Sequence, residues 1–185
     1  MTLSQLDELA NIIDRDCKEK NEKELHTIIS INQEYVETLF DSKIKATLYY
    51  FLANAWSALR TIKQEQNTSV IWYYEQHELN QEIIHLRKAR NEKDFSKLRI
   101  EYQCSILTNL ANIFSHAGRT IQAIRLYSQA LNIESNFFMA QANRGTCFLT
   151  YARLDHDEDN RSIFVKFAYD NLKEAINKIS LYINN

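Results

Sequence analysis

Residues 106–136 read ILTNLANIFSHAGRTIQAIRLYSQALNIESN, and this stretch decides the fold. Before Gly118, apolar side chains recur every three or four residues, which is the spacing of one face of an α-helix. A second pattern of this kind begins at about Thr120 and ends at about Asn132. Gly118 lies directly between the two patterns, where glycine readily adopts the left-handed conformation that ends a helix. The stretch therefore predicts two α-helices joined by a tight turn.

The residues of this helical hairpin resemble the tetratricopeptide repeat (TPR). In that family a bulky residue, Leu, a small residue and an aromatic stand on the first helix. A glycine marks the turn, and Ala, an aromatic and Ala stand on the second helix. The matching residues are, in order, Leu107, Leu110, Ala111, Phe114, Gly118, Ala123, Tyr127 and Ala130, whereas Ser135 replaces the usual proline. Because one such hairpin cannot bury both of its faces, we expect neighbouring hairpins to stack on it.

Apolar residues at helical spacing predict helices along the rest of the chain as well. The expected ranges are 4–17, 22–39, 43–63, 69–90, 94–116, 120–132, 136–153 and a last helix ending near Ile179, with Val70, Tyr73, Tyr74 and Ile84 on the apolar face of the fourth. We expect Ser4 with Asp7 to cap the first helix, Asp41 with Ser42 to cap the third, and residues 64–68 to form a polar turn. About eight helices with short connections predict an all-α fold of antiparallel hairpins, and no linker divides residues 1–185, so a single domain is expected.

The other units match the TPR pattern less well. Residues 52–57 repeat the small and aromatic positions of residues 110–115, but many more residues separate their two helices. In the unit after the best repeat, Gly145 and Phe148 keep their places, while Gln141 and Arg144 replace apolar residues. The prediction is therefore an irregular TPR-like α-solenoid rather than a uniform array.

Composition excludes several other classes of protein. The 185 residues include no proline and two glycines, which is incompatible with a glycine-rich phosphate loop and disfavours an all-β fold. The formal net charge is -2, so the chain as a whole has no electrostatic attraction to nucleic acid or anionic lipid. No apolar run approaches the roughly 20 residues that span a membrane, and the N-terminus is unlike a signal peptide. With three dispersed cysteines, these features predict a cytoplasmic protein with reduced thiols.

A closer resemblance covers residues 102–175. Their run of motifs is similar to the TPR region of bacterial proteins that carry a C-terminal HEPN domain, a small helical domain that is often an RNase of toxin or antiviral systems. HEPN RNases use an Arg followed by four to six residues and a His, and this spacing is absent from the sequence. The resemblance therefore implies a TPR part without the nuclease, in a bacterial defence or toxin setting, with an RNase-type effector as partner.

No set of residues predicts catalysis, a cofactor or a metal site. His77 and His85 are about 12 Å apart along one predicted helix, too far to share a metal. Asp155, Asp157 and Asp159 alternate as in a calcium loop, but Lys166 stands where the bidentate Glu belongs. The alternative for this loop is a solvated acidic segment that favours the N-terminus of the last helix. We therefore predict a protein that is not an enzyme.

Basic residues gather near the predicted turn between the fourth and fifth helices. A basic patch with neighbouring aromatics is one way to contact RNA. Glu92, Asp94 and Glu101 are interspersed, so a mixed-charge, solvated hairpin tip is the alternative. The residues that would contact RNA are Arg87, Lys88, Arg90, Lys93, Lys97 and Arg99.

Polar residues on the first helices of the hairpins suggest a protein-binding role. In TPR folds these helices line the concave surface, and a side-chain amide can both donate to and accept from a peptide backbone. The expected groove residues are Asn54, Asn112, Ser115, His116, Asn143 and Thr146. The alternative, equally supported by the sequence, is that the asparagines bridge adjacent helices. We predict a protein-interaction scaffold that binds a peptide or partner domain, with a second copy of the chain and RNA as other partners left open.

Overall fold

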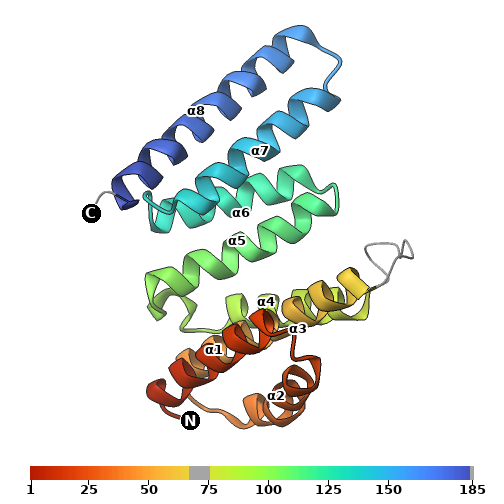
Figure 1. The fold of residues 1–185 in the computed structure, drawn as a ribbon. Helices are drawn as coiled ribbons and strands as arrows, with labels where there is room; N and C mark the ends of the chain where they lie inside the picture. Colours follow the sequence, from red (N-terminus) through yellow and green to blue (C-terminus); the bar gives the residue numbers. More distant parts are fainter. Residues whose placement is uncertain (67–75, 184–185) are drawn as a thin grey trace. The chain divides into compact units, whose positions relative to one another are not determined.

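The computed structural model describes residues 1–66 and 76–183, which contain α-helices and short 3-10 helices but no strand (Figure 1). The helices are α1 (Leu3–Lys18), α2 (Glu22–Tyr35), η1 (Val36–Thr38), α3 (Ser42–Gln66), α4 (His77–Asn91), η3 (Phe95–Lys97), α5 (Ile100–His116), α6 (Thr120–Ile133), α7 (Phe138–Leu154) and α8 (Glu158–Ile183). The prediction of an all-α fold is confirmed.

Residue contacts group the chain into two compact units, Met1–Tyr102 and Gln103–Asn185, which are described separately below. The expected single domain over residues 1–185 stays a prediction. No helix in the described part of the chain is long and apolar enough to cross a membrane.

The N-cap of helix α1 is two residues earlier in the chain than expected. The Thr2 hydroxyl accepts from the Gln5 backbone N–H at 3.3 Å, and the Gln5 side chain accepts from the Thr2 N–H at 2.8 Å. This reciprocal capping box replaces the expected pair of Ser4 and Asp7, which already lie inside the helix. At the other end, Lys20 has a φ of 55°, the left-handed conformation that glycine usually supplies.

Helix α3 is the centre of the first unit. Its N-terminus is capped as expected, since the Asp41 carboxylate accepts from the N–H groups of Lys43 at 2.9 Å and Ile44 at 3.1 Å. The helix continues to Gln66. The prediction of a polar turn beginning at residue 64 is therefore wrong, because residues 64–66 are still helical. Buried Leu48, Leu52 and Leu59 place its apolar face in the core.

Ion pairs and aromatic contacts connect α3 to α2 and α4. Arg60 pairs with buried Glu82 of α4 at 3.0 Å, and Lys63 pairs with Glu78 at 2.5 Å. Trp56 is buried between two imidazoles, with ring centroids 6.5 Å from His26 and 5.3 Å from His77 in edge-on geometry. The pKa of Glu82 is nevertheless raised, because burial raises it by more than the positive charge of Arg60 lowers it.

One expectation for α4 needs correction, and another lies outside the described residues. Helix α4 begins at His77, and the expected apolar residues Val70, Tyr73 and Tyr74 lie outside the described residues. Ile84, expected on the apolar face, is exposed.

The helix expected over 94–116 is interrupted. Leu98 is buried with an extended backbone (φ -65°, ψ 162°), so the segment divides into η3 and α5. The spacing of apolar residues cannot reveal such a break. Leu98 fits the helical spacing whether or not the helix is continuous there.

The hairpin of α5 and α6 has the geometry expected from the quoted stretch. Gly118 has a φ of 73°, and its turn is a Schellman motif: the Arg119 N–H donates to the Phe114 carbonyl at 2.8 Å and the Gly118 N–H to Ser115 at 3.0 Å. The small and apolar positions of the TPR pattern are buried, namely Leu107, Leu110, Ala111, Ala123, Tyr127 and Ala130.

Helix α7 returns to α5 at a repeat-like interval. Asn143 contacts Asn112 and Cys147 contacts Ser115, at sequence separations of 31 and 32 residues. First helices of consecutive hairpins therefore lie together, as in a repeat of about 34 residues.

Helix α8 packs antiparallel to α7, and a glycine sets how close they come (Figure 1). A Cβ on Gly145 would lie 2.9 Å from Leu172 Cγ and 3.2 Å from the Ala168 carbonyl oxygen, closer than van der Waals contact. The acidic loop caps the N-terminus of α8. The Asp155 carboxylate accepts from the Asp157 N–H at 3.0 Å, and the Asp157 carboxylate accepts from the Asn160 N–H at 2.9 Å. These contacts match the helix-capping alternative for the loop.

Candidate functional site

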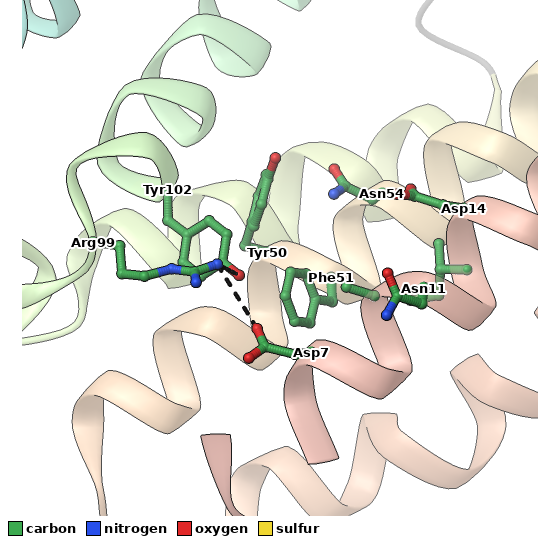
Figure 2. Close-up of a pocket in the computed structure, with 10 residues that line it drawn as sticks. Asp7, Asn11, Asp14, Tyr50, Phe51, Asn54, Arg99 and Tyr102 are labelled. Carbon is green, nitrogen blue, oxygen red and sulfur yellow. Dashed lines mark hydrogen bonds and ion pairs between the residues drawn. The ribbon is translucent and has the colours of Figure 1, made fainter. Parts of the chain in front are cut away.

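A cavity of about 450 Å³ opens beside α1 and α3 in the first unit (Figure 2). One face of α1 lines it with residues three and four apart, and one face of α3 lines it opposite. Arg99 and Tyr102 complete the wall from the end of the same unit. The lining residues are Asp7, Ala10, Asn11, Ile13, Asp14, Tyr50, Phe51, Asn54, Arg99 and Tyr102.

Three aromatic rings form one wall of this cavity. Phe51 is buried and meets Tyr102 edge-on at a centroid distance of 5.6 Å. Tyr50 lies 5.7 Å from each of these two rings. Contacts of this kind favour defined ring positions. The half-buried rings of Tyr50 and Tyr102 are the more accessible part of this wall.

Arg99 is held at the edge of the aromatic wall. Its guanidinium carbon lies 4.2 Å from the centroid of the Tyr102 ring, and it also contacts the Tyr102 hydroxyl. Asp7 forms a longer ion pair with Arg99 at 3.8 Å, and both side chains are more than half exposed. Burial raises the pKa of Tyr102 although Arg99 lowers it, so the phenol stays protonated at neutral pH.

Two side-chain amides border the same cavity. Asn54, one of the expected groove residues, is half-buried on α3, and Asn11 is exposed on α1. Figure 2 shows Asn54 and Asp14 at one end of the cavity and Arg99 with Tyr102 at the other. The structure thus brings Asn54 together with Tyr50 and Phe51, whose role the sequence did not indicate.

A second cavity of about 410 Å³ adjoins the first. It shares Asp7, Arg99 and Tyr102 with the first cavity, and its floor is apolar. Its other lining residues are Leu6, Asp41, Lys43, Ile44, Thr47, Lys97 and Leu98. We call the two cavities together the α1–α3 groove.

The expected groove residues of the second unit make bonds within the fold. The Tyr127 hydroxyl donates to Asn112 Oδ1 at 2.7 Å, and the Asn143 amide donates to the same oxygen at 2.9 Å. Asn112 and Asn143 therefore bridge helices, which was the alternative interpretation of the asparagines.

The three other expected groove residues of the second unit, Ser115, Thr146 and His116, each have different surroundings. Ser115 lies 3.2 Å from the Cys147 sulfur, and the Thr146 hydroxyl donates to the Ala142 carbonyl within α7 at 3.2 Å. His116 is exposed at the end of α5. Burial raises the pKa of the Cys147 thiol, which fits a reduced core cysteine.

A polar network in the second unit explains the two departures from the repeat pattern. Asn171 Oδ1 accepts from Arg144 Nε at 2.8 Å and from Gln141 Nε2 at 3.1 Å. Arg144 also donates to Ser128 at 3.0 Å and Gln141 to Glu174 at 2.9 Å. Polar residues at positions where a repeat needs apolar ones were the sequence signal for this network, but the partner Asn171 was not identified.

The predicted basic cluster is divided among several contacts. Lys88 pairs with Glu37 at 2.6 Å, Lys97 with Asp94 at 2.7 Å, and Arg99 with Asp7. Arg87, Arg90 and Lys93 are exposed. Because carboxylates pair with Lys88, Lys97 and Arg99, the field of the cluster on a phosphate backbone is weakened.

Lys88 belongs to a further cluster around Tyr49. Its ammonium lies 5.2 Å from the Tyr49 ring, and buried His85 lies 6.1 Å from that ring. Burial lowers the pKa of His85, while Glu37 is lowered in pKa by its hydrogen bond with Lys88. Among the residues with described positions, no three His, Cys, Asp or Glu side chains gather as metal ligands.

Comparisons with known proteins give structural matches at low sequence identity. No protein-family model matches the chain, and no curated protein is significantly similar to it in sequence. A crystal structure of MamA aligns with a TM-score of 0.49 and 13% identity, over 98% of this chain and 93% of that chain. A second MamA structure aligns with a TM-score of 0.43 and 13% identity, over 95% and 83% of the two chains.

Proposed function

We propose that this protein is an interaction module that holds a peptide segment of a partner protein in its α1–α3 groove. The observation that carries this proposal is the arrangement of Asn54 and Asn11 beside the aromatic wall of Tyr50, Phe51 and Tyr102. Binding without turnover is the function proposed, in agreement with the expectation from the sequence.

The two kinds of lining residue suit the two parts of a peptide. An aromatic wall buries an apolar side chain, and ring faces offer a large contact area at a low cost in entropy. A carboxamide donates and accepts, so Asn54 and Asn11 can pair with backbone carbonyl and N–H groups. The cavity of about 450 Å³ is within the range of small ligand sites.

The stacked hairpins of the second unit support a scaffold role. The interval of 31 and 32 residues between contacting positions of α5 and α7 is that of a helical repeat. Repeat proteins commonly use such surfaces for binding other proteins. The resemblance of residues 102–175 to HEPN-linked TPR regions makes an RNase-type effector domain, in a bacterial defence or toxin system, the finer form of this proposal.

The test is selection of peptides from a random display library on the full 185-residue chain. The affinity of selected peptides is then measured for wild type, Asn54→Ala and Tyr50→Ala. We expect a loss of at least tenfold for both variants, because each removes a groove contact. Asn177→Ala, an exposed change on α8, is the matched control and is expected to bind as wild type does.

Two results would contradict the proposal. The first is a selection that enriches no peptide. The second is a set of enriched peptides whose affinities are unchanged by Asn54→Ala and Tyr50→Ala, which would move the binding surface elsewhere. Far-UV circular dichroism of each variant shows that the helices are intact, so a loss of binding is not a loss of fold.

A further inference from the structure

We propose that the α1–α3 groove selects peptides by charge polarity, taking a basic side chain at its Asp14 end and an acidic side chain at its Lys43 end. An apolar side chain lies between these two on the aromatic wall. This inference rests on the proposed function and specifies the ligand class for the same groove.

The first cavity carries an excess of negative charge. Asp7 and Asp14 line it from α1, and Arg99 is the one cation among the described residues that line it. Arg99 is already paired with Asp7, so Asp14 is the charge that remains for a ligand at the Asn54 end. A lysine or arginine side chain beside Asp14 would therefore be favoured.

The second cavity has the opposite balance. Lys43, Lys97 and Arg99 line it against Asp7 and Asp41. These three cations exceed the two lining carboxylates by one charge. The Asp41 carboxylate accepts from the first N–H groups of α3, at 2.9 Å and 3.1 Å, where the positive end of the helix dipole offsets part of its charge. Lys97 forms an ion pair with Asp94, whereas Lys43 interacts with that carboxylate only at longer range, so Lys43 is the better placed of the two lysines for a ligand. An aspartate or glutamate side chain is thus the complement of this end.

The pair of Asp7 and Arg99 lies between the two ends, because both residues line both cavities. At 3.8 Å the pair neutralises the middle of the groove. The Tyr102 ring holds Arg99 in place, and Tyr50 and Phe51 offer an apolar surface next to it. The middle position therefore suits an uncharged, apolar side chain.

Helix geometry sets the spacing of the two ligand charges. Lys43 and Asn54 are eleven positions apart on α3, which corresponds to about 16 Å along its axis. An extended peptide advances about 3.3 Å per residue, so about five residues separate its basic and acidic side chains. The ligand class is a short extended peptide with opposite charges about five residues apart and an apolar residue between them.

The test compares three synthetic peptides of equal length that share the apolar residue and differ at the two charged positions. One has a basic and an acidic residue, one has two basic residues, and one has two acidic residues. Fluorescence anisotropy with the full chain is expected to show at least tenfold tighter binding of the mixed-charge peptide. The difference should shrink as salt is raised, since the charges are exposed.

Two charge reversals change the preference in opposite directions. Asp14→Lys is expected to favour the peptide with two acidic residues, and Lys43→Glu the peptide with two basic residues. The matched controls are Asp170→Lys on α8 and Lys23→Glu on α2, both exposed and outside the groove, which are expected to keep the preference for the mixed peptide.

The failure of this inference is distinct from that of the proposed function. If display-selected peptides bind and depend on Asn54, but the order of the three peptides is unchanged by Asp14→Lys and Lys43→Glu, charge polarity is overturned and the peptide groove stands. If no peptide of any kind binds, both proposals fall.

Discussion

The Tyr127 hydroxyl donates a 2.7 Å hydrogen bond to Oδ1 of Asn112, linking the two helices of the best-matched hairpin. The Asn143 amide donates to the same oxygen from the next hairpin. One acceptor thus joins three helices, and burial raises the pKa of Tyr127, which keeps the phenol protonated as a donor. Asn112 is half-buried, and both of these hydrogen bonds lie within the second unit.

The first prediction follows from this shared acceptor. Asn112→Ala should lower the free energy of unfolding by about 2 kcal/mol, because two partly buried donors lose their partner. Urea denaturation followed by circular dichroism measures the effect. Asn132→Ala, an exposed change on α6, serves as the control and should cost less than about 0.5 kcal/mol. Unchanged stability of Asn112→Ala would instead favour its role as a ligand contact.

The two glycines should respond to alanine for different reasons. At Gly118 a new Cβ meets no heavy atom within 4 Å, so Gly118→Ala should cost about 1 kcal/mol from the left-handed backbone alone. At Gly145 a Cβ lies 2.9 Å from Leu172 Cγ, so Gly145→Ala should cost about 1–3 kcal/mol by overpacking.

A double-mutant cycle with Leu172→Ala separates these two causes. Removing the Leu172 side chain should relieve part of the cost of Gly145→Ala and none of the cost of Gly118→Ala. Thermal unfolding of the single and double variants gives the coupling. Additive effects for Gly145→Ala and Leu172→Ala would show that α7 and α8 are not in the close contact described.

Buried His85 should make stability depend on pH. Its Nδ1 lies 2.7 Å from the Gln81 carbonyl oxygen, which can only accept, so Nδ1 carries the proton of the neutral ring. Burial is the main cause that lowers its pKa, Lys88 adds to it, and Gln81 and Glu37 oppose it. As pH falls below about 6.5, the unfolded chain binds a proton that the folded chain resists, and stability decreases.

Urea midpoints measured between pH 8 and 5.5 test this dependence. His85→Leu should remove part of the decrease, whereas His156→Gln, an exposed change, should keep it. An identical decrease in wild type and His85→Leu would assign the pH effect to other groups.

The polar network of the second unit should be costly to break. Asn171→Ala leaves Arg144 Nε and Gln141 Nε2 without the acceptor that they share, so a loss of about 2–3 kcal/mol is expected. Asn177→Ala on the exposed side of α8 is the matched control. Equal stability of the two variants in urea would mean that water replaces the lost acceptor without cost.

The parts of the fold that the sequence predicted are those decided by neighbours in the chain. Gly118 and the small residues Ala111 and Ala123 specify the turn and close packing of one hairpin, and their signal lies within about 30 residues. The Asp41 cap was predictable for the same reason. Leu98 shows the limit, because its extended backbone depends on burial against distant residues.

The candidate site was less predictable, because it depends on residues far apart in the chain. Asn54 was identified from its repeat position, but Tyr50 and Tyr102 meet only after folding, at a centroid distance of 5.7 Å. Amide chemistry alone also could not separate a ligand contact from a helix bridge. Asn112 and Asn54 occupy equivalent sequence positions, and the donors Tyr127 and Asn143 distinguish Asn112.

The burial of Trp56 between His26 and His77 supplies an optical probe that needs no label. Trp56 lies within Met1–Tyr102, so the fluorescence of its indole follows the first unit. Far-UV ellipticity follows helices in both units. Coincident transitions by the two signals would show that the halves of the chain melt as one cooperative block, and separated transitions would give each half its own stability.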